Sequence, residues 1–411
     1  MQRPKILVLS QMFPSRQFPS SGTFVMERAE ALSEFADVRV ISPVPLAPPI
    51  PGSGRYARFA KVERSGQTQS GLQYWRPRYF VLPKLAGFIQ GYTLARATMR
   101  TIRESFGPWR PDVIDSHFAF PDGFAAVKVG RSIGSRAFIT CHGSDLAKLP
   151  GLAVTGKLLR WALKNADQVF AVSPHLKQQA LQLGCDNQRL TFLPNAVDTQ
   201  RFSPRDKTQC RQKLNLPAEK FIAICVASLD ANKNQIVLLR MMSQLAAEGQ
   251  ERFHLVLLGG GPDRKWLQSQ ADQMGIQSLV TFAGVKPFEE VPLWMSAADV
   301  LVLCSKREGW PTVYFEAMAC GLPIISANLP SAPFAICKPE LGLIVPDNLS
   351  GQFALAIKKL ASQSVDSNAI RNFALEHSWQ NWATQMMKIV RDVCGQSHAP
   401  PAVRIEEEHL I

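Results

Sequence analysis

The sequence predicts an α/β protein built from two parallel sheets, each covered by helices on both faces. Three observations support this prediction: short apolar runs of strand length recur along all 411 residues, most of them are continuous rather than alternating, and helix-compatible segments separate most of them. Strands that are apolar on both faces are typical of parallel sheets between two helical layers. The length suits two domains better than one core.

The strand-like runs form two sets. The first set is "KILVLSQ", "DVRVIS", "DVIDSH", "RAFITCHG" and "QVFAVS"; the second is "FIAICVAS", "FHLVLLGGG", "LVTFAG", "DVLVLCS", "LPIISA" and "LGLIVP". Helices are expected between them, for example over Phe24–Phe35, Gly151–Ala166, Asn234–Glu248 and Pro262–Met274. The two sets indicate two Rossmann-like domains.

The boundary between the domains is expected in "LPNAVDTQRFSPRD", residues 193–206, where prolines interrupt the pattern. The expected organisation is a first domain over 1–200, a second domain over 201–379, a terminal helix over about 380–395 and a flexible tail over 396–411.

Composition limits the class of protein. No window approaches 18 uninterrupted apolar residues, so no membrane-spanning helix is expected. The apolar run in the N-terminal segment "MQRPKILVLSQ" is too short for a signal peptide, so we interpret this segment as the first strand. The eight cysteines form no CxxC pair, so we expect them to be reduced and buried in a cytoplasmic protein, with no zinc site.

The net charge of +13 is unevenly distributed. Residues 1–200 contain 25 Lys or Arg and 13 Asp or Glu, a net of +12, whereas residues 201–411 contain 21 and 20, a net of +1. This asymmetry predicts an acidic partner for the first half, such as an anionic membrane surface, nucleic acid or a phosphorylated substrate. A basic surface that only aids solubility is the alternative.

One segment of the basic half combines aromatic and basic residues. Within Gln73–Ser105 they are Trp75, Tyr79, Phe80, Phe88, Arg76, Arg78, Lys84, Arg96, Arg100 and Arg103. If the segment from Leu85 is helical, the last three arginines share one face. Such a face suits an anionic membrane, but a helix packed on its own sheet with a solvated basic face would show the same pattern.

Ligands of open α/β sheets bind beyond the carboxyl ends of the strands, so the turns there are the candidate sites. Gly22 and Thr23 precede a helix, where backbone amides bind anions. His142 follows the strand in "TCHGSD", where it could contact a sugar hydroxyl or a phosphate oxygen, and His117 ends another strand with weaker support. Each of these residues could instead be structural.

Two more turns belong to the second domain. Lys233, in "VASLDANKNQ", lies between a strand and a helix and could neutralise a phosphate, or could be a solvated lysine. The glycines of "LLGGGPDRKWL" match neither GxGxxG nor a P-loop, and a tight turn explains them equally well.

The stretch "SKREGWPTVYFEAMACGLPII" places a turn between a strand and a helix. Free amides from Gly309 to Val313 would open the helix and suit a diphosphate, with a helix-dipole contribution of roughly 0.3–2 kcal/mol. Glu316 would lie in about the first helical turn, within reach of a ribose diol, and Glu308 would face the group beyond the diphosphate. Two surface glutamates that favour a helix are the alternative.

Together these residues resemble the retaining, nucleotide-sugar-dependent glycosyltransferases of family 4, which have the GT-B fold of two Rossmann-like domains facing across a cleft. "EGWPTVYFEAMACGLPII" is similar to the E-x7-E signature of that family. "SGTFV", "TCHGSD", "LPNAVDTQRF" and "VASLDANKNQ" follow in the family's order and spacing. "FPSSGTFV" with "HFAFPDG" resembles the subgroup that builds cell-surface polysaccharides, such as teichuronic-acid-type enzymes.

The resemblance implies a role for each candidate. His142 would contact the transferred sugar, Lys233 the diphosphate, Glu308 the sugar hydroxyls and Glu316 the ribose. The full set of implied donor-binding residues is Gly22, Thr23, Ser228, Lys233, Val285, Glu308, Gly309, Trp310, Pro311, Thr312, Val313 and Glu316, of which Val285 would lie by the base. His142, Glu308 and Lys233 would be the catalytic residues, and the terminal helix would return to the first domain.

Two departures from the family pattern affect these expectations. Ser228 stands where many members have an arginine as a second phosphate clamp, so diphosphate binding would depend more on Lys233 and backbone amides. Residues 328–334, "NLPSAPF", lack the paired glycines that members often carry, which puts the acceptor-side loop in question.

The implied reaction uses a UDP- or GDP-linked sugar as co-substrate and a glycan or lipid-linked acceptor. No DxD motif is present, so no divalent metal and no other cofactor are expected. The resemblance implies front-side attack, in which the leaving phosphate accepts the acceptor's proton and His142 orients rather than acts as an obligatory base. The rivals are a GT-B nucleotide-sugar epimerase, which the E-x7-E turn disfavours, and a basic nucleic-acid-binding protein, for which no recognition element is visible.

Overall fold

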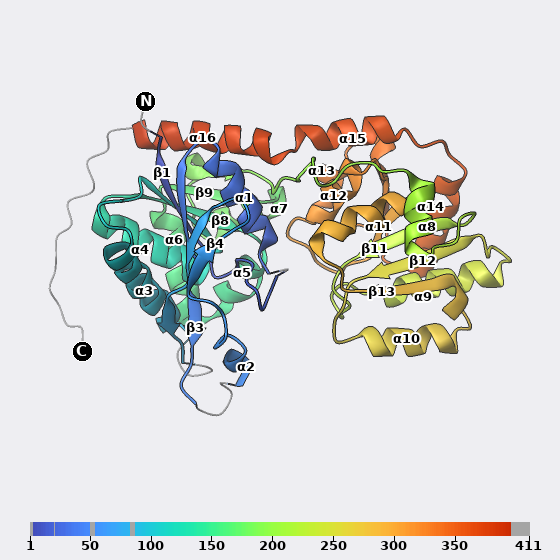
Figure 1. Cartoon of the computed structure of the whole chain (residues 1–411), viewed down its shortest axis with the longest axis horizontal. Coiled ribbons are helices and arrows are strands. Elements are labelled where there is room, and N and C mark those ends of the chain that lie inside the picture. The colour runs from blue at the N-terminus through green and yellow to red at the C-terminus, as the bar shows by residue number, and fades with distance from the viewer. Residues whose placement is uncertain (1–2, 20, 50–53, 83–86, 396–411) are drawn as a thin grey trace. The chain divides into compact units, whose positions relative to one another are not determined.

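The structure is a computed structural model that describes residues 3–19, 21–49, 54–82 and 87–395; the expected flexible tail at 396–411 lies outside the described residues. The chain divides into two compact units, Met1–Pro194 with Trp382–Ile411, and Asn195–Asn381 (Figure 1). Each unit contains a mostly or fully parallel sheet with helices on its faces, which confirms the predicted α/β fold.

The sheet of the first unit has the strand order β10-β9-β8-β7-β1-β2-β5-β4. Its strands, with the small β3–β6 pair, are β1 (Lys5–Leu9), β2 (Asp37–Ile41), β3 (Val44–Leu46), β4 (Ser65–Gln67), β5 (Gln73–Trp75), β6 (Arg78–Phe80), β7 (Val113–His117), β8 (Arg136–Cys141), β9 (Gln168–Ala171) and β10 (Leu190–Phe192). Of the described pairs, β4–β5 is antiparallel and the others are parallel. The order reverses at β1, so the loops after β1 and β7 meet at a topological switch point, where ligands of such sheets bind.

The helices of the first unit form two layers. They are α1 (Thr23–Ser33), α2 (Gly54–Ala57), α3 (Ile89–Ser105), α4 (Phe124–Ile133), α5 (Ser144–Lys148), α6 (Ala153–Asn165), α7 (Pro174–Gln182) and most of α16 (Trp379–Gly395). α4 packs against α3, α6 and the strands β7 and β8. α1 packs next to the terminal helix, because the guanidinium of Arg28 lies 4.3 Å from the ring centre of Trp382.

The sheet of the second unit has the order β13-β12-β11-β14-β15-β16, and all its described pairs are parallel. Its strands are β11 (Phe221–Val226), β12 (Phe253–Leu258), β13 (Val280–Gly284), β14 (Val300–Leu303), β15 (Ile324–Ala327) and β16 (Gly342–Val345). Every strand of this sheet matches a run that the sequence predicts. The switch point falls between β11 and β14, where Ala223 pairs with Val300.

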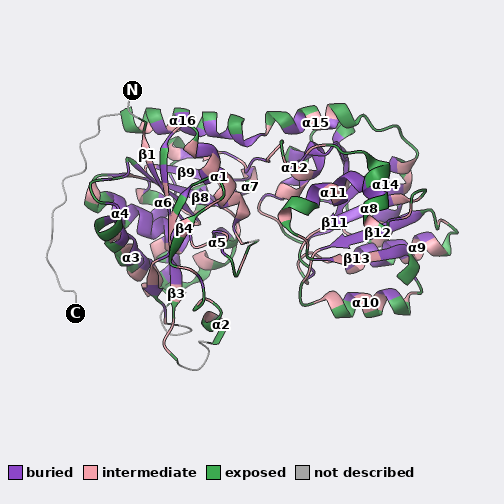
Figure 2. Cartoon of the chain, viewed as in Figure 1, coloured by how far each residue is buried: buried purple, intermediate pink, exposed green. Residues whose placement is uncertain are grey.

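Helices cover both faces of the second sheet, with their outer sides exposed and the strands between them buried (Figure 2). They are α8 (Lys207–Leu214), α9 (Ile236–Ala247), α10 (Arg264–Gln273), α11 (Val291–Ala297), α12 (Thr312–Ala319), α13 (Ala332–Ala335), α14 (Ser350–Ala361) and α15 (Ser367–Glu376). α9 packs against α10 and α14, whereas α12 packs against α11 and α15.

Two expectations about exposure are wrong in part. All eight cysteines are free as expected, but Cys337 and Cys394 are exposed rather than buried. Of the four aromatic residues assigned to a membrane-facing segment, Tyr79 is buried and Trp75 packs against the same core cluster, whereas Phe80 and Phe88 are exposed. The reason is that β5 and β6 direct alternate side chains inward, so these aromatic residues fill the core.

Candidate active site

The carboxyl edge of the second sheet brings two predicted residues into contact. The Nζ atom of Lys233, in the loop after β11, lies 2.6 Å from Oε1 of Glu308, in the loop after β14. These residues are 75 positions apart in the chain, and they meet because β11 and β14 are neighbours at the switch point. Both side chains are largely shielded from solvent, so water screens their Coulomb attraction less than that of an exposed ion pair.

The loop that carries Lys233 is held by Asp230. Oδ1 of Asp230 accepts hydrogen bonds from the amides of Asn232 (2.9 Å) and Lys233 (3.1 Å). Ser228, which was predicted to be one of the donor-binding residues, donates its hydroxyl to Oδ2 of the same carboxylate at 2.5 Å. Burial raises the pKa of Asp230, but these hydrogen bonds outweigh it and the pKa is lowered overall. The structure thus shows Ser228 supporting the turn.

The two loops are also joined through their backbones. The amide of Lys306 donates to the carbonyl of Asn232 at 2.8 Å, and the Asn232 side chain donates to the carbonyl of Arg307 at 3.0 Å. Asn234 adopts a positive φ of 58°, which asparagine tolerates better than most residues. The ion pair is therefore positioned by fixed backbone rather than by two free side chains.

The amino end of α12 lies directly after Glu308 in the chain. The helix begins at Thr312, within the stretch Gly309–Val313 whose amides the sequence predicted to open it, and Pro311 before it has no amide to offer. The amide of Tyr314 donates to the carbonyl of Pro311, so the amides of Thr312 and Val313 precede the first helical hydrogen bond. These amides and the helix dipole form a local site for an anion.

Glu316 is the fifth residue of α12, close to its predicted place in about the first helical turn. Burial raises its pKa to about 7, against the opposing effects of a hydrogen bond from Thr312 and the charge of Arg201. The guanidinium of Arg201 also stacks on Phe288, with 4.8 Å to the ring centre. Sequence reasoning missed Arg201, because nothing in its local pattern connects it to a helix more than a hundred positions away.

The glycine turn after β12 packs tightly on the loop after β11. A Cβ on Gly259 would lie 1.9 Å from the Ala227 carbonyl oxygen, and one on Gly261 would lie 2.2 Å from that of Leu229. The tight-turn interpretation of these glycines is therefore supported. Gly260 lies close to Val285, since a Cβ there would be 2.7 Å from Cγ2 of that residue, and Val285 itself is exposed.

The first unit brings the two strand-end histidines together. β7 and β8 are paired in parallel, with His117 opposite Thr140, so His117 and the residue after β8, His142, reach the same edge. Nδ1 of His117 lies 3.0 Å from Nε2 of His142 and the rings stack. Burial, and next the charge of Arg28, lower the pKa of His142 to about 3, so both rings are neutral at physiological pH.

A network of buried groups surrounds the histidine pair. Asp145 accepts hydrogen bonds from the amides of Gly143 (2.9 Å) and Ala119 (2.9 Å), which ties the loop after β8 to the loop after β7. Behind the pair, Arg28 and Asp115 form a fully buried bidentate ion pair with distances of 3.0 and 3.1 Å. Gly143 and Asp145 belong to the stretch "TCHGSD" that the sequence analysis singled out, whereas nothing in the sequence pointed to Arg28 and Asp115.

Gly22 and Thr23 open α1 at the same edge of the sheet. Gly22 has a φ of 73°, and a Cβ on it would lie 2.4 Å from the carbonyl oxygen of Met12. Phe24, which follows, places its ring centre 4.8 Å from that of His142. Gly22, Thr23 and His142 are thus gathered in the first unit, and Ser228, Lys233, Val285, Glu308–Val313 and Glu316 lie around the carboxyl edge of the second.

Two further properties concern the described residues alone. No group of three or more His, Cys, Asp and Glu side chains there is arranged to hold a metal ion. In the same part of the chain, every helix is either too short or too polar to cross a bilayer.

Two Rossmann-like units, one with a helix end beside a lysine and two glutamates, are the arrangement expected of a GT-B glycosyltransferase that uses a nucleotide-sugar donor. The family model "Glycosyltransferase Family 4" matches residues 21–201, and the model "Glycosyl transferases group 1" matches residues 206–377. The chain belongs to glycosyltransferase family 4, whose members are retaining hexosyltransferases.

The relatives of known name include several glycosyltransferases. The chain is 29% identical to the "Putative teichuronic acid biosynthesis glycosyltransferase TuaC" of Bacillus subtilis, over 83% of this chain and 85% of that protein. It is 27% identical to the GDP-mannose-dependent α-(1-6)-phosphatidylinositol monomannoside mannosyltransferase of Mycolicibacterium smegmatis, over 67% and 74%. These matches confirm the resemblance that the sequence motifs indicated.

Solved structures support the fold. The chain superposes on HepE of Anabaena, crystallised with UDP, with a TM-score of 0.72 and 16% identity, over 94% of this chain and all of that one. It superposes on a sucrose-phosphate synthase of Thermosynechococcus elongatus with a TM-score of 0.75 and 19% identity, over 96% and 100%.

Proposed function

We propose that this glycosyltransferase moves a hexosyl residue from a UDP- or GDP-linked sugar to a growing cell-surface glycan or a lipid-linked acceptor. The observation that carries the donor side of this proposal is the Lys233–Glu308 pair beside the amino end of α12. The names of relatives favour the acceptor class: one is assigned to teichuronic acid biosynthesis and another acts on a phosphatidylinositol mannoside.

The donor diphosphate lies at the free amides of Thr312 and Val313 and beside Lys233. Its arrival gives Lys233 a second anionic partner, so the lysine shares its charge between Glu308 and phosphate. Glu316 accepts hydrogen bonds from the ribose diol, and Glu308 accepts them from hydroxyls of the donor sugar. Charge on the leaving diphosphate is stabilised by Lys233 and the helix-end amides.

Transfer proceeds on one face of the donor sugar. The bond between C1 and the diphosphate oxygen breaks, a bond between C1 and the acceptor oxygen forms, and the acceptor's proton passes to the leaving phosphate. His142 is neutral because of its lowered pKa, so it orients a sugar hydroxyl through a hydrogen bond and does not take up the proton.

A pocket of about 260 Å³ in the first unit supports the acceptor assignment. It lies beyond the carboxyl ends of β1 and β2 and its lining includes Phe13, Phe18, Arg58 and Arg76. Aromatic rings suit the apolar face of a sugar, and the exposed guanidinium of Arg58 suits a phosphate of a lipid-linked acceptor, whereas Arg76 is buried and paired with Glu63. The enzyme then works in the cytoplasm at the inner face of the membrane, where such acceptors are presented.

The donor assignment is tested by incubating the purified protein with a panel of UDP- and GDP-sugars and scoring nucleoside diphosphate by mass spectrometry. Release from one donor that rises when membrane lipid extract or glycan is added supports transfer. A free epimer as the sole product, with or without acceptor, would identify an epimerase instead. The release is expected to persist in excess EDTA; complete loss that Mn²⁺ or Mg²⁺ restores would contradict a metal-independent reaction.

The site assignment is tested with two variants. Glu316→Ala is expected to weaken nucleotide binding about 10- to 100-fold, because a charge-assisted hydrogen bond is lost. Glu308→Ala is expected to lower turnover more than nucleotide binding, since its partner is the transferred sugar. Calorimetry and steady-state kinetics measure the two effects, with the exposed Glu340→Ala as a matched control. Wild-type affinity and rate in both variants would show that the donor site is elsewhere.

A further inference from the structure

A second pocket lies beside the Lys233 loop, in the second unit, and none of the residues assigned to the donor lines it. Its volume is about 320 Å³, which is within the range of small-ligand pockets, roughly 300–1,000 Å³. It is formed where the loop after β11, the start of α9, the start of α10 and the loop after β14 meet.

One wall of the pocket is apolar and contains an aromatic residue. The side chains of Ile236, Trp266 and Leu267 form it, and Leu267 is buried beneath the pocket whereas Trp266 is 50% exposed. A half-exposed indole on a concave surface leaves apolar area in contact with water. A ligand that covered the ring would remove this area from water and lower the free energy. The flat indole face is available to a ligand from the pocket side.

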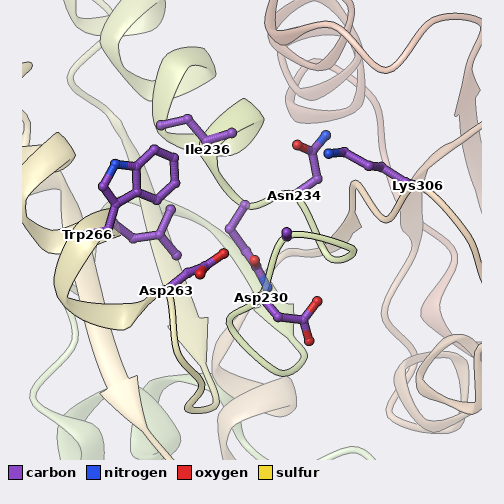
Figure 3. Close-up of a pocket in the computed structure, with 9 residues that line it drawn as sticks. Asp230, Asn234, Ile236, Asp263, Trp266 and Lys306 are labelled. Carbon is purple, nitrogen blue, oxygen red and sulfur yellow. The ribbon is translucent and has the colours of Figure 1, made fainter.

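The remaining wall is polar and its groups are uncommitted. In Figure 3 the heads of Asn234 and Lys306 lie opposite Trp266, and the Asp263 carboxylate lies between the two walls. Among the hydrogen bonds and ion pairs of the described residues, none engages the side-chain polar atoms of these three residues. By contrast, the nearby Asp230 carboxylate is fully occupied by its own turn.

We propose that this pocket binds a hexopyranose unit of the glycan acceptor, as a subsite apart from the reacting centre. The C–H groups on one face of a pyranose ring pack on the indole of Trp266, while its hydroxyls donate to Asp263 and accept from Asn234 and Lys306. This chemistry fits a neutral or acidic sugar better than the alternatives. A quaternary ammonium group would suit the indole and the carboxylate, but Lys306 would repel it.

The inference rests on the proposed function, because the bound hexopyranose is a unit of the glycan acceptor named there. An enzyme that extends a polymer meets the same glycan many times. A subsite on the unit that binds the donor would keep the chain near the enzyme between transfers and raise its local concentration. Binding itself requires no turnover, so it can be measured separately from transfer.

The test is saturation-transfer NMR and calorimetry on the full-length protein with three probes: maltotetraose, mannotetraose and a hyaluronan tetrasaccharide. Wild-type protein is expected to bind at least one of them with millimolar affinity. Trp266→Ala should weaken that binding about tenfold or more, equivalent to about 1.4 kcal/mol. Asp263→Asn should weaken it less, because an amide still hydrogen-bonds hydroxyls, and Trp266→Phe should retain most of it.

Lys265→Ala is the matched control, because Lys265 is exposed on the same helix and does not line the pocket. Unchanged oligosaccharide binding in Trp266→Ala, or no binding of any probe to the wild type, would overturn the proposal. Binding of choline or uridine that depends on Trp266, in place of the sugars, would overturn it as well. UDP and GDP affinities measured on the same variants are expected to be unchanged; if the wild type bound neither nucleotide, the donor assignment would fail and the sugar result would stand alone.

Discussion

Glu316 occupies a position where its negative charge is unfavourable until a ligand arrives. Burial at α12 raises its pKa to about 7, although Thr312 and Arg201 act in the opposite direction. A buried carboxylate with free acceptor positions can accept hydrogen bonds from the two hydroxyls of a diol. The same placement makes the ligand-free protein less stable at neutral pH, because a buried charge costs free energy.

The stability cost of Glu316 has a definite pH dependence. Because its folded pKa is raised from the ordinary value of 4.5, the folded state keeps the proton longer than the unfolded state, and stability falls as pH rises from 4.5 through about 7. Glu316→Gln should therefore stabilise the ligand-free protein at pH 8, on the order of 1 kcal/mol, and have little effect at pH 4. Scanning calorimetry at both pH values measures this, with the exposed Glu340→Gln as control. An equal shift at both pH values would contradict the assignment.

His142 is expected to contribute no titration to turnover. Its pKa of about 3 leaves it neutral across the range in which an ordinary histidine, with a pKa of about 6.5, would change charge. His142→Gln should lower turnover about 10- to 100-fold by loss of orientation while leaving the shape of the pH profile unchanged. Rates measured from about pH 5.5 to 8.5 check this. A wild-type inflection near 6.5 that disappears in the variant would mean that His142 exchanges a proton in the reaction.

At the scale of elements, α16 completes the packing of the first unit. Its Trp382 ring covers the guanidinium of Arg28 at 4.3 Å, and Arg28 on α1 is paired with Asp115 on β7. Because Asp115 lies two residues before His117 on the same strand, the helix, the ion pair and the histidine edge form one packed unit. Removal of one partner of this pair would leave a buried charge.

The buried ion pair predicts a strongly non-additive result. Asp115→Ala should destabilise the protein by about 3–5 kcal/mol, and replacing both partners, Arg28→Met with Asp115→Leu, should recover most of that loss. Urea unfolding monitored by circular dichroism measures both effects. The control is Arg100→Ala, because the Arg100–Glu104 pair is exposed and should contribute within about 0.5 kcal/mol. Additive losses in the double variant would show that packing volume, not charge, dominates at this position.

At the scale of the whole molecule, the net charge of +12 on residues 1–200 against +1 on residues 201–411 suggests a membrane role for the first half. The structure supplies a surface for it on α3: Arg96, Arg100 and Arg103 are all exposed, and Tyr92 is 47% exposed beside them. The face that packs on the protein contains Leu94 and Ile102, so the basic side of the helix faces away from the core, with Arg100 paired to Glu104 on that exposed side.

We expect this surface to bind anionic vesicles. Each arginine near such a surface contributes about 1 kcal/mol at most, and salt screens it. Reversal to glutamate at Arg96, Arg100 and Arg103 should abolish co-sedimentation with anionic liposomes without unfolding the protein. The matched control reverses Arg240, Lys265 and Lys359, which are exposed on the second unit. Equal binding to neutral liposomes, or none to either, would leave the basic surface as a solvated one.

The sequence by itself determined the two parallel sheets, because long strands buried on both faces need continuous apolar runs, and it determined the family through the spacing of Glu308 and Glu316. It overlooked the short strands β3, β4, β5, β6 and β10, each of three residues, because three residues are too few to show a periodic pattern. It also assigned Tyr79 to a surface, whereas this side chain is buried in the core.

Only the tertiary structure decided which groups meet. Lys233 and Glu308 form their pair because β11 and β14 are adjacent at the switch point, and the two histidines stack because β7 and β8 are adjacent. The buried contact of Arg28 with Trp382 joins residues near opposite ends of the chain. Local patterns are set by the one-dimensional alternation of apolar and polar residues, whereas these contacts depend on strand order and on the return of α16, which no local pattern specifies.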